Sequence, residues 1–205
     1  MALISELVDD FNDNTVDPLL WPNSYGDITE TGGRARVPCT IDYAAYSSAA
    51  IYTLAASSVF CRIYPPANGG ATAEAWAQLL INSATEGTDI VFEINAASGN
   101  LNAGSRAGWF DPDAVSAPYD PVAHAWLRIR ETGGQLLWDT SPDGTAWTNF
   151  RTLAVSPAWV ADADSQVQLI CHRDGGTGDY AEFDNLNVPV AAPPTRRKAA
   201  FLAFF

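Results

Sequence analysis

Residues 124–150, HAWLRIRETGGQLLWDTSPDGTAWTNF, contain two chain reversals and three short runs that suit strands. In the run LRIR at 127–130, apolar residues alternate with arginines, as in a strand with one buried face and one wet face. The glycine pair at 133–134 supplies the positive φ of a tight hairpin. SPDG at 141–144 reverses the chain again, because proline fixes φ and glycine accepts the left-handed conformation. The stretch therefore predicts a three-stranded meander.

Further strand patterns recur along the chain between turn signals. We expect a turn-rich segment at residues 12–26, a loop at 43–48, a long aromatic loop at 108–123 and one helical turn at 156–160. Together with the meander, the spacing predicts twelve or thirteen strands and an all-β antiparallel sandwich. The other expected strands are residues 5–11, 28–30, 35–41, 51–54, 58–64, 89–95, 101–107, 165–173 and 180–188, the last with a bulge-like slip after Phe183.

Residues 73–83, AEAWAQLLINS, fit two structures. Thr72 is a suitable helix cap, and three large apolar residues fall at helical spacing. The same stretch also alternates with a period of two and lies between expected strands, which favours a strand. We therefore expect a strand here and keep helix as the alternative.

Composition bounds the organisation of the chain and its partners. At 205 residues, the chain fits one large domain, which we place at residues 1–188. Acidic residues outnumber basic ones 24 to 11, for a net charge of −13. A surface of that sign repels nucleic acid and anionic membranes, so neither is an expected partner. No apolar run is long enough to span a membrane.

Three cysteines and the first residues bear on the compartment. Cys39, Cys61 and Cys171 stand singly in apolar runs without the paired spacing of a metal site, so we expect three small buried side chains. Residues 1–11, MALISELVDDF, have three acids and no basic segment, unlike a signal peptide. We therefore expect synthesis and folding in a reducing cytoplasm.

The end of the chain differs in composition from the domain. Residues 189–195, PVAAPPT, predict an extended linker, and RRKAAFLAFF follows. One interpretation is a segment that packs back on its own domain. The other is a docking tail that inserts into a neighbouring subunit through Phe201, Leu202, Phe204 and Phe205.

Three stretches carry a resemblance to a known superfamily. They are VDDFND at 8–13 followed by Trp21, the hairpin WLRIRETGGQLLWDTSPDGTAW at 126–147, and AEFDNLNV at 181–188. In this order they resemble the concanavalin A-like lectin/glucanase superfamily, in its laminin-G-like branch, over residues 5–188. The resemblance implies a jelly-roll sandwich, and its members include lectins, hydrolases and structural modules.

The compact form, the lack of a signal sequence and the excess of arginine over lysine also resemble minor tail proteins of actinobacterial phages. That resemblance implies a non-enzymatic virion protein, made in the host cytoplasm and assembled with other virion proteins and with copies of itself. Its lectin-like domain would contact host-surface glycans. The alternatives are a stand-alone carbohydrate-binding module, a capsid decoration protein and a glucanase-like hydrolase.

Catalytic patterns are weak in this chain. Glycosidases of the resembled superfamily place several carboxylates on alternate positions of one strand. Here Asp89 and Glu93 share a face, but Val91 stands between them and Asn95 follows where another acid is wanted. The only histidines, His124 and His172, have no triad pattern, and we expect His172 on an exposed strand face. We therefore expect no enzymatic activity.

Two kinds of binding site remain. The resemblance implies a calcium ion that ties the first strand to the last through Asp10 and Asp184, and no other cofactor is expected. Flat aromatic and planar polar side chains suit sugars, and tryptophan and arginine also suit subunit contacts. The residues expected on an open sheet face for one of these two roles are Trp76, Gln78, Arg106, Trp109, Arg128 and Arg130.

Overall fold

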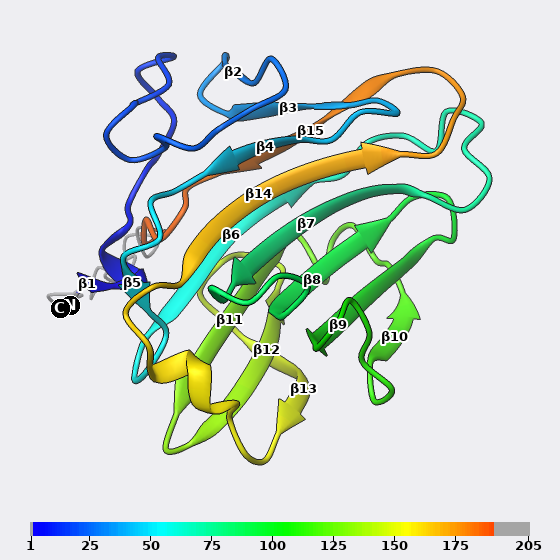
Figure 1. Cartoon of the computed structure of the whole chain (residues 1–205). Coiled ribbons are helices and arrows are strands. Elements are labelled where there is room, and N and C mark those ends of the chain that lie inside the picture. The colour runs from blue at the N-terminus through cyan, green and yellow to red at the C-terminus, as the bar shows by residue number, and fades with distance from the viewer. Residues whose placement is uncertain (1, 191–205) are drawn as a thin grey trace, which may run out of the picture.

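The computed structural model describes residues 2–190, which form a sandwich of two antiparallel sheets (Figure 1). The all-β antiparallel sandwich expected from the sequence is therefore confirmed. The elements are β1 (Ala2–Leu3), η1 (Ile4–Glu6), β2 (Thr29–Glu30), β3 (Ala35–Cys39), β4 (Ala44–Ser47), β5 (Tyr52–Thr53), β6 (Ser58–Tyr64), β7 (Ala75–Asn82), β8 (Asp89–Asn95), β9 (Asn100–Arg106), β10 (Val115–Pro118), β11 (Trp126–Thr132), β12 (Gln135–Ser141), β13 (Thr148–Leu153), η2 (Ala158–Ala161), β14 (Gln166–Arg173) and β15 (Asp179–Asp184).

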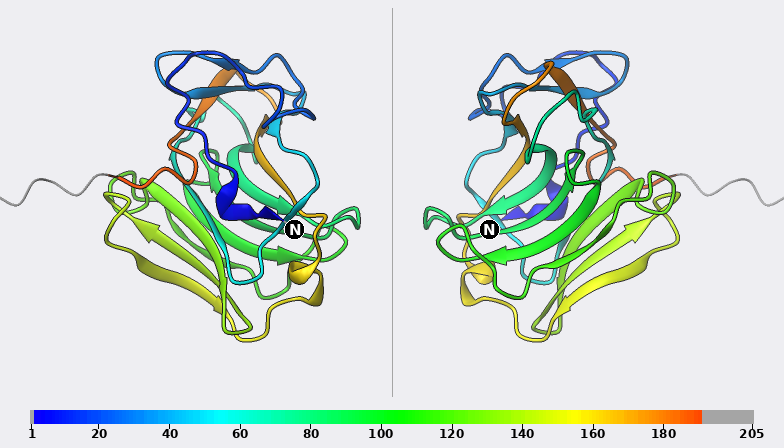
Figure 2. Two further views of the ribbon diagram at one scale, coloured as in Figure 1. Left: turned by 90° about the vertical axis from the view of Figure 1, so that its left-hand side faces the viewer. Right: turned by 90° about the vertical axis from the view of Figure 1, so that its right-hand side faces the viewer.

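The two large sheets differ in strand order. The six-stranded sheet runs β10-β9-β8-β7-β14-β4, and the seven-stranded sheet runs β13-β12-β11-β6-β15-β3-β2. A short parallel pair, β1 with β5, lies apart from both. The side views of Figure 2 show the two sheets as separate layers. Because β14 and β15 are consecutive in the chain but lie in different sheets, the connection between them joins the two layers.

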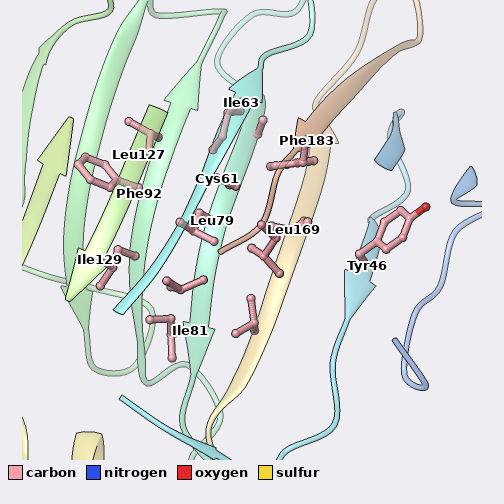
Figure 3. Packing of buried hydrophobic residues seen from close by; sticks show 14 of the residues in the cluster. Tyr46, Cys61, Ile63, Leu79, Ile81, Phe92, Leu127, Ile129, Leu169 and Phe183 are labelled. Carbon is pink, nitrogen blue, oxygen red and sulfur yellow. The ribbon is translucent and has the colours of Figure 1, made fainter. Parts of the chain in front are cut away.

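The core lies between the two sheets. The inward positions on β7 include Leu79 and Ile81. Figure 3 shows them together with Cys61 and Ile63 of β6, which belongs to the opposite sheet, in the core cluster. These side chains are almost fully buried, which provides the main apolar contribution to stability. Trp138 of β12 also crosses the core, where its indole Nε1 donates to the carbonyl oxygen of Val91 at 2.9 Å.

Several sequence expectations are confirmed. Residues 124–150 contain the expected meander, β11, β12 and the first half of β13, and β6 and β8 have the expected bounds. The ambiguous residues 73–83 form strand β7, paired on both sides by β8 and β14. All three cysteines are buried and unbonded to one another. Among residues 2–190, no helix has the length and apolar character to cross a membrane.

The expected first strand at residues 5–11 is wrong. η1 is followed by irregular chain that pairs with the end of the domain only at the bridge between Asp9 and Leu186. The carboxylate of Asp9 accepts the amide hydrogen of Phe11 at 2.9 Å, and that of Asp10 accepts the amide of Asn12 at 3.1 Å. Such local bonds give the backbone an alternative to a sheet ladder.

Other boundaries also differ from expectation. Residues 43–48, expected as loop, contain β4, and the long loop at 108–123 contains the edge strand β10. The last strand, β15, ends at Asp184, because Asn185 and Asn187 adopt left-handed φ angles of 54°. The side chain of Asn187 then accepts the amide of Phe60 and donates to two carbonyl oxygens near the N-terminus. Short polar contacts of this kind leave little trace in hydrophobic periodicity.

Candidate functional site

The outer face of the six-stranded sheet carries an unusual set of side chains. Alternation along β7 places Trp76, Gln78, Leu80 and Asn82 on this face, opposite the inward Leu79. An outer sheet face is ordinarily wet, yet Gln78 is only 3% exposed. Here a second, smaller apolar cluster covers the sheet, made by Ala45, Trp76, Leu80, Val91 and Ile170.

Loops from three parts of the chain surround this face and leave a groove of about 390 Å³ over it. We call it the β7–β14 groove, because those two strands form its floor. Its lining combines aromatic rings with carboxamides, a combination that suits stacking on sugar faces and bonding of hydroxyls. The lining residues are Tyr25, Tyr43, Trp76, Gln78, Leu80, Asn82, Arg106, Trp109, Gln168 and Ile170.

Exposed aromatic rings lie at the rim of the groove. Tyr43 is 51% exposed and Trp109 is 61% exposed, and Tyr25 is the third exposed ring in the lining. Phe110, beside Trp109 in the chain, is also exposed but does not line the groove. Large rings left open to solvent around one hollow are typical of a binding site rather than of a core.

Tyr43 is held in place by a buried histidine. Its ring stacks on His172 with centroids 4.1 Å apart and planes 5° apart, and both rings contact Trp76. His172 Nε2 lies 3.1 Å from Glu74 Oε2. The expected exposed position of His172 is therefore wrong: Tyr43 and Trp76 cover it, and it is 8% exposed.

Trp109 is held in an unfavourable backbone conformation. Its φ is +67°, in the left-handed region that costs a non-glycine residue about 1–2 kcal/mol. Its amide donates to the carbonyl oxygen of Gly87 at 2.9 Å. A Cβ added to Gly87 would lie 2.9 Å from the indole Nε1, so the ring rests directly against the glycine backbone. Strain of this kind persists where surrounding contacts fix the residue, often at functional sites.

The one arginine in the groove lining is neutralised. Arg106 binds Asp89 through two hydrogen bonds, Nε to Oδ1 at 2.7 Å and Nη2 to Oδ2 at 2.9 Å. Asp89 is fully buried. Burial raises the pKa of the Asp89 carboxyl, and the Arg106 hydrogen bonds oppose that shift. Arg106 therefore does not offer a free cation to an anionic ligand.

Glu93 has a different environment. It lies on the same face of β8 as Asp89 but has no cationic partner among residues 2–190. Instead its carboxylate accepts Gln78 Nε2 at 2.6 Å and Asn102 Nδ2 at 2.9 Å. It lines a smaller hollow of about 160 Å³, which shares Arg106 with the β7–β14 groove. Glu93 is thus the carboxylate on this face best placed to meet a ligand.

The structure brings together four of the six expected contact residues. Trp76, Gln78, Arg106 and Trp109 line the β7–β14 groove. Arg128 and Arg130 are instead on β11 of the other sheet, where both donate to Asp139 Oδ2. Alternation identifies the outward face of a strand, but not which sheet the strand joins, so the sequence grouped two separate surfaces. Their role as contacts stays a prediction.

Several lining residues were missed by the sequence analysis. Tyr25 and Tyr43 come from the segments expected as turn-rich chain and as a loop, and no pattern places them beside β7. Gln168 had a usable signal, because it alternates with the inward Val167 and Leu169 of β14. An amide at an outward position of a central strand indicates a face that is not purely structural.

The calcium site expected at Asp10 and Asp184 does not fit. Asp10 is occupied by the amide of Asn12, and Asp184 accepts Asn185 Nδ2 at 2.7 Å. The carboxylate at the junction of the first and last segments is Asp9, which accepts Trp21 Nε1 at 2.7 Å. Among residues 2–190, no group of three or more His, Cys, Asp or Glu side chains could hold a metal ion.

The chain shares its jelly-roll sandwich fold with solved structures of other proteins. No family model matches the sequence, and no curated protein is similar to it in sequence. Solved structures are similar in fold. The catalytic domain of an endo-1,3-beta-glucanase (laminarinase) from Thermotoga petrophila RKU-1 has a TM-score of 0.65 at 10% identity, over 87% of this chain and 94% of that one.

Two further structures belong to the same group. A laminarinase from Flavobacterium sp. UMI-01 gives a TM-score of 0.64 at 10% identity, covering 87% of this chain and 96% of that one. The beta-glucanase of Bacillus licheniformis gives 0.62 at 12% identity, covering 87% and 95%. At such identities the likeness shows a shared fold, one in which carbohydrate-active proteins are built.

These neighbours contradict the expectation of a non-enzymatic protein. Three solved structures that share this fold over at least 94% of their own length are laminarinases, so the fold is one that glycoside hydrolases use. The sequence expectation rested on Val91 and Asn95 in place of further acids and on the lack of a triad pattern around the histidines. Val91 and Asn95 leave fewer carboxylates on the strand, but Glu93 and the groove beside it are in place.

Proposed function

We propose that the protein binds a glycan chain in the β7–β14 groove. The observation that carries this proposal is the groove itself, which has exposed aromatic rings at its rim and carboxamides on its floor, over the outer face of the six-stranded sheet. The fold shared with glucanases supports the same class of ligand.

A binding panel tests this proposal. Soluble β-1,3-glucan, mixed-linkage β-glucan and fragments of bacterial cell-wall glycan would be titrated against the full chain by calorimetry. Gln78→Ala should weaken the binding of whichever glycan binds, because Gln78 lies on the groove floor. Gln135→Ala, a matched change at an exposed position of β12, should leave it unchanged. Failure of all three glycans to bind would contradict the proposal.

Hydrolysis of the bound glycan is the second candidate function, and Glu93 favours it. A carboxylate between two amide donors, beside a glycan-sized groove, suits a nucleophile or a charge stabiliser. Asp89 is a poor second carboxylate. It is fully buried, and Arg106 binds both of its carboxylate oxygens.

The test of hydrolysis is release of reducing ends from the glycan that binds best. Glu93→Gln should abolish release and leave binding within a few-fold, because the amide keeps the shape of the side chain. Asp89→Asn should act differently, lowering the melting temperature because it leaves Arg106 without its partner. Reducing-end release that is unchanged in Glu93→Gln would exclude Glu93 as the catalytic group.

A virion role is a separate proposal that the fold does not address. It rests on the resemblance to phage tail proteins and on the apolar residues 201–205, which lie outside the described residues. Deletion of residues 189–205 tests it: a smaller assembly by light scattering with unchanged glycan binding would support a docking tail. An unchanged particle size would contradict it.

A further inference from the structure

We infer that the glycan lies lengthwise along β7 and β14, between Tyr43 at one end of the groove and Trp109 at the other, and that it is an uncharged chain. This inference rests on the proposed function and specifies the direction, the end contacts and the ligand class of the same site.

The direction follows from the lining. β7 contributes every second residue from Trp76 to Asn82, and β14 contributes Gln168 and Ile170 beside them. β8, the neighbour of β7 on the other side, contributes none. β9 contributes only Arg106, which is level with Asn82 through the pairs Asn82–Asp89 and Asp89–Arg106. The floor of the groove therefore follows β7 and β14 over roughly 20 Å of extended chain and reaches across β8 only at the Asn82 end.

Two of the three exposed rings, Tyr43 and Trp109, mark opposite ends of that path. Tyr43 stacks on His172, which is paired with Trp76 at the start of β7. Trp109 packs on Gly87 in the connection between β7 and β8, which follows Asn82 at the end of β7. A chain of sugar rings that fills the groove would therefore meet one aromatic platform at each end.

Both platforms are fixed before a ligand arrives. A parallel ring stack at 4.1 Å holds Tyr43, and the left-handed backbone with the Gly87 contact holds Trp109. Rings that need no ordering on binding lose little conformational entropy, which favours affinity. The strained Trp109 backbone is explained if the position of the ring is what matters.

The ligand class follows from the charges between the platforms. Arg106, the only basic residue in the lining, is already bound by Asp89. The remaining polar groups of the floor are the amides of Gln78, Asn82 and Gln168, and Glu93 next to Gln78 is negative. A uronate or sulfate ester would meet no free cation there, whereas hydroxyl groups have both donors and acceptors.

A length series tests the direction. β-1,3-Glucan oligosaccharides from two to six sugars would be titrated against the full chain. For the wild type, affinity should rise with length until the groove is filled. Tyr43→Ala and Trp109→Ala should each weaken the six-sugar ligand by roughly three- to tenfold, the range of one aromatic contact, and should flatten the dependence on length.

Matched variants test whether the loss of affinity comes from the two rings at the ends of the groove or from the loss of any exposed ring. Phe110→Ala removes an equally exposed ring outside the groove and should change nothing. Tyr43→Phe keeps the stacked ring and should retain affinity. Gly87→Ala displaces the Trp109 indole and should reproduce Trp109→Ala, with melting temperatures confirming that each variant is folded.

The outcomes that overturn the inference differ from those that overturn the proposed function. If the six-sugar ligand binds, but Tyr43→Ala and Trp109→Ala leave its affinity within twofold while Asn102→Ala weakens it, the glycan crosses β8 near Glu93 and the lengthwise path is wrong. If a sulfated or uronate-containing glycan binds more tightly than the neutral one, the ligand class is wrong. If no glycan binds, the proposed function fails as well.

Discussion

At the scale of single residues, two carboxylates beside the groove have different environments although they are close in the sequence. Asp89 and Glu93 are four positions apart on one strand face, yet one is locked to Arg106 and the other is held by two amides. Chemical identity was readable from the sequence, but the partner of each carboxylate was not. The partners come from β7 and β9, and their register decides which carboxylate remains available.

Glu30 is the residue whose ionisation should control stability. It is buried, both carboxylate oxygens lack a hydrogen-bond partner among residues 2–190, and Asp9 and Asp13 are nearby. Burial, with the nearby acids Asp13 and Asp9, raises the pKa of Glu30 to about 7. The folded protein therefore holds this proton between about pH 4.5 and 7, where the unfolded chain releases it.

The predicted consequence is a loss of stability as pH rises from about 4.5 through 7, reaching an upper bound of roughly 3 kcal/mol above that range. Glu30→Gln removes the ionisation, so its melting temperature should match the wild type at pH 5 and exceed it at pH 8. Glu86→Gln, an exposed control, should follow the wild type at both values. Equal pH profiles for Glu30→Gln and the wild type would contradict the assignment.

At the scale of elements, the two sheets are joined at one edge by a buried ion pair. Arg151 of β13 donates to Asp111 Oδ2 at 2.6 Å and to the carbonyl oxygen of Ala103 on β9 at 2.7 Å. Asp111 also accepts the amide of Ser105, and these donors hold the pKa of its carboxyl low against the effect of burial. The loop after β9 is thereby fixed to both layers.

Removal of one partner should be costly here. Asp111→Ala leaves the Arg151 guanidinium buried without an anion and is expected to lower the free energy of unfolding by about 3–5 kcal/mol in urea titrations. Arg34→Ala breaks an ion pair with Glu182 that is partly open to water, so a loss below about 1 kcal/mol is expected. Comparable losses in the two variants would show that burial does not set the strength of the Arg151 pair.

At the scale of the whole molecule, the sandwich encloses its thiols. Cys39, Cys61 and Cys171 are each fully buried and none forms a disulfide. Burial raises the pKa of Cys61, which makes its thiolate still less available. We expect no reaction of the folded protein with a thiol reagent within minutes, three equivalents on denaturation, and a melting temperature independent of reductant. Rapid labelling of the folded protein would indicate opening of the sandwich.

The sequence by itself determined the fold class and most strands, because period-two alternation and turn chemistry are local properties of residues such as those at 127–144. It also identified Trp76, Gln78 and Arg106 from the alternation of outward side chains along strands, and Trp109 from the aromatic composition of the long loop at 108–123. It went wrong at residues 5–11, where side-chain bonds from Asp9 and Asp10 replace a ladder.

Only the tertiary structure decided which outward side chains share one surface. Sheet membership separates Arg128 and Arg130 from the groove, and the fold brings Tyr43 and Trp109 to opposite ends of β7. The likeness to solved glucanase structures, which no sequence comparison found, also contradicts the expectation of a non-enzymatic protein. The physical reason is the range of the interactions: alternation acts between adjacent residues, whereas register and loop packing join positions more than a hundred residues apart.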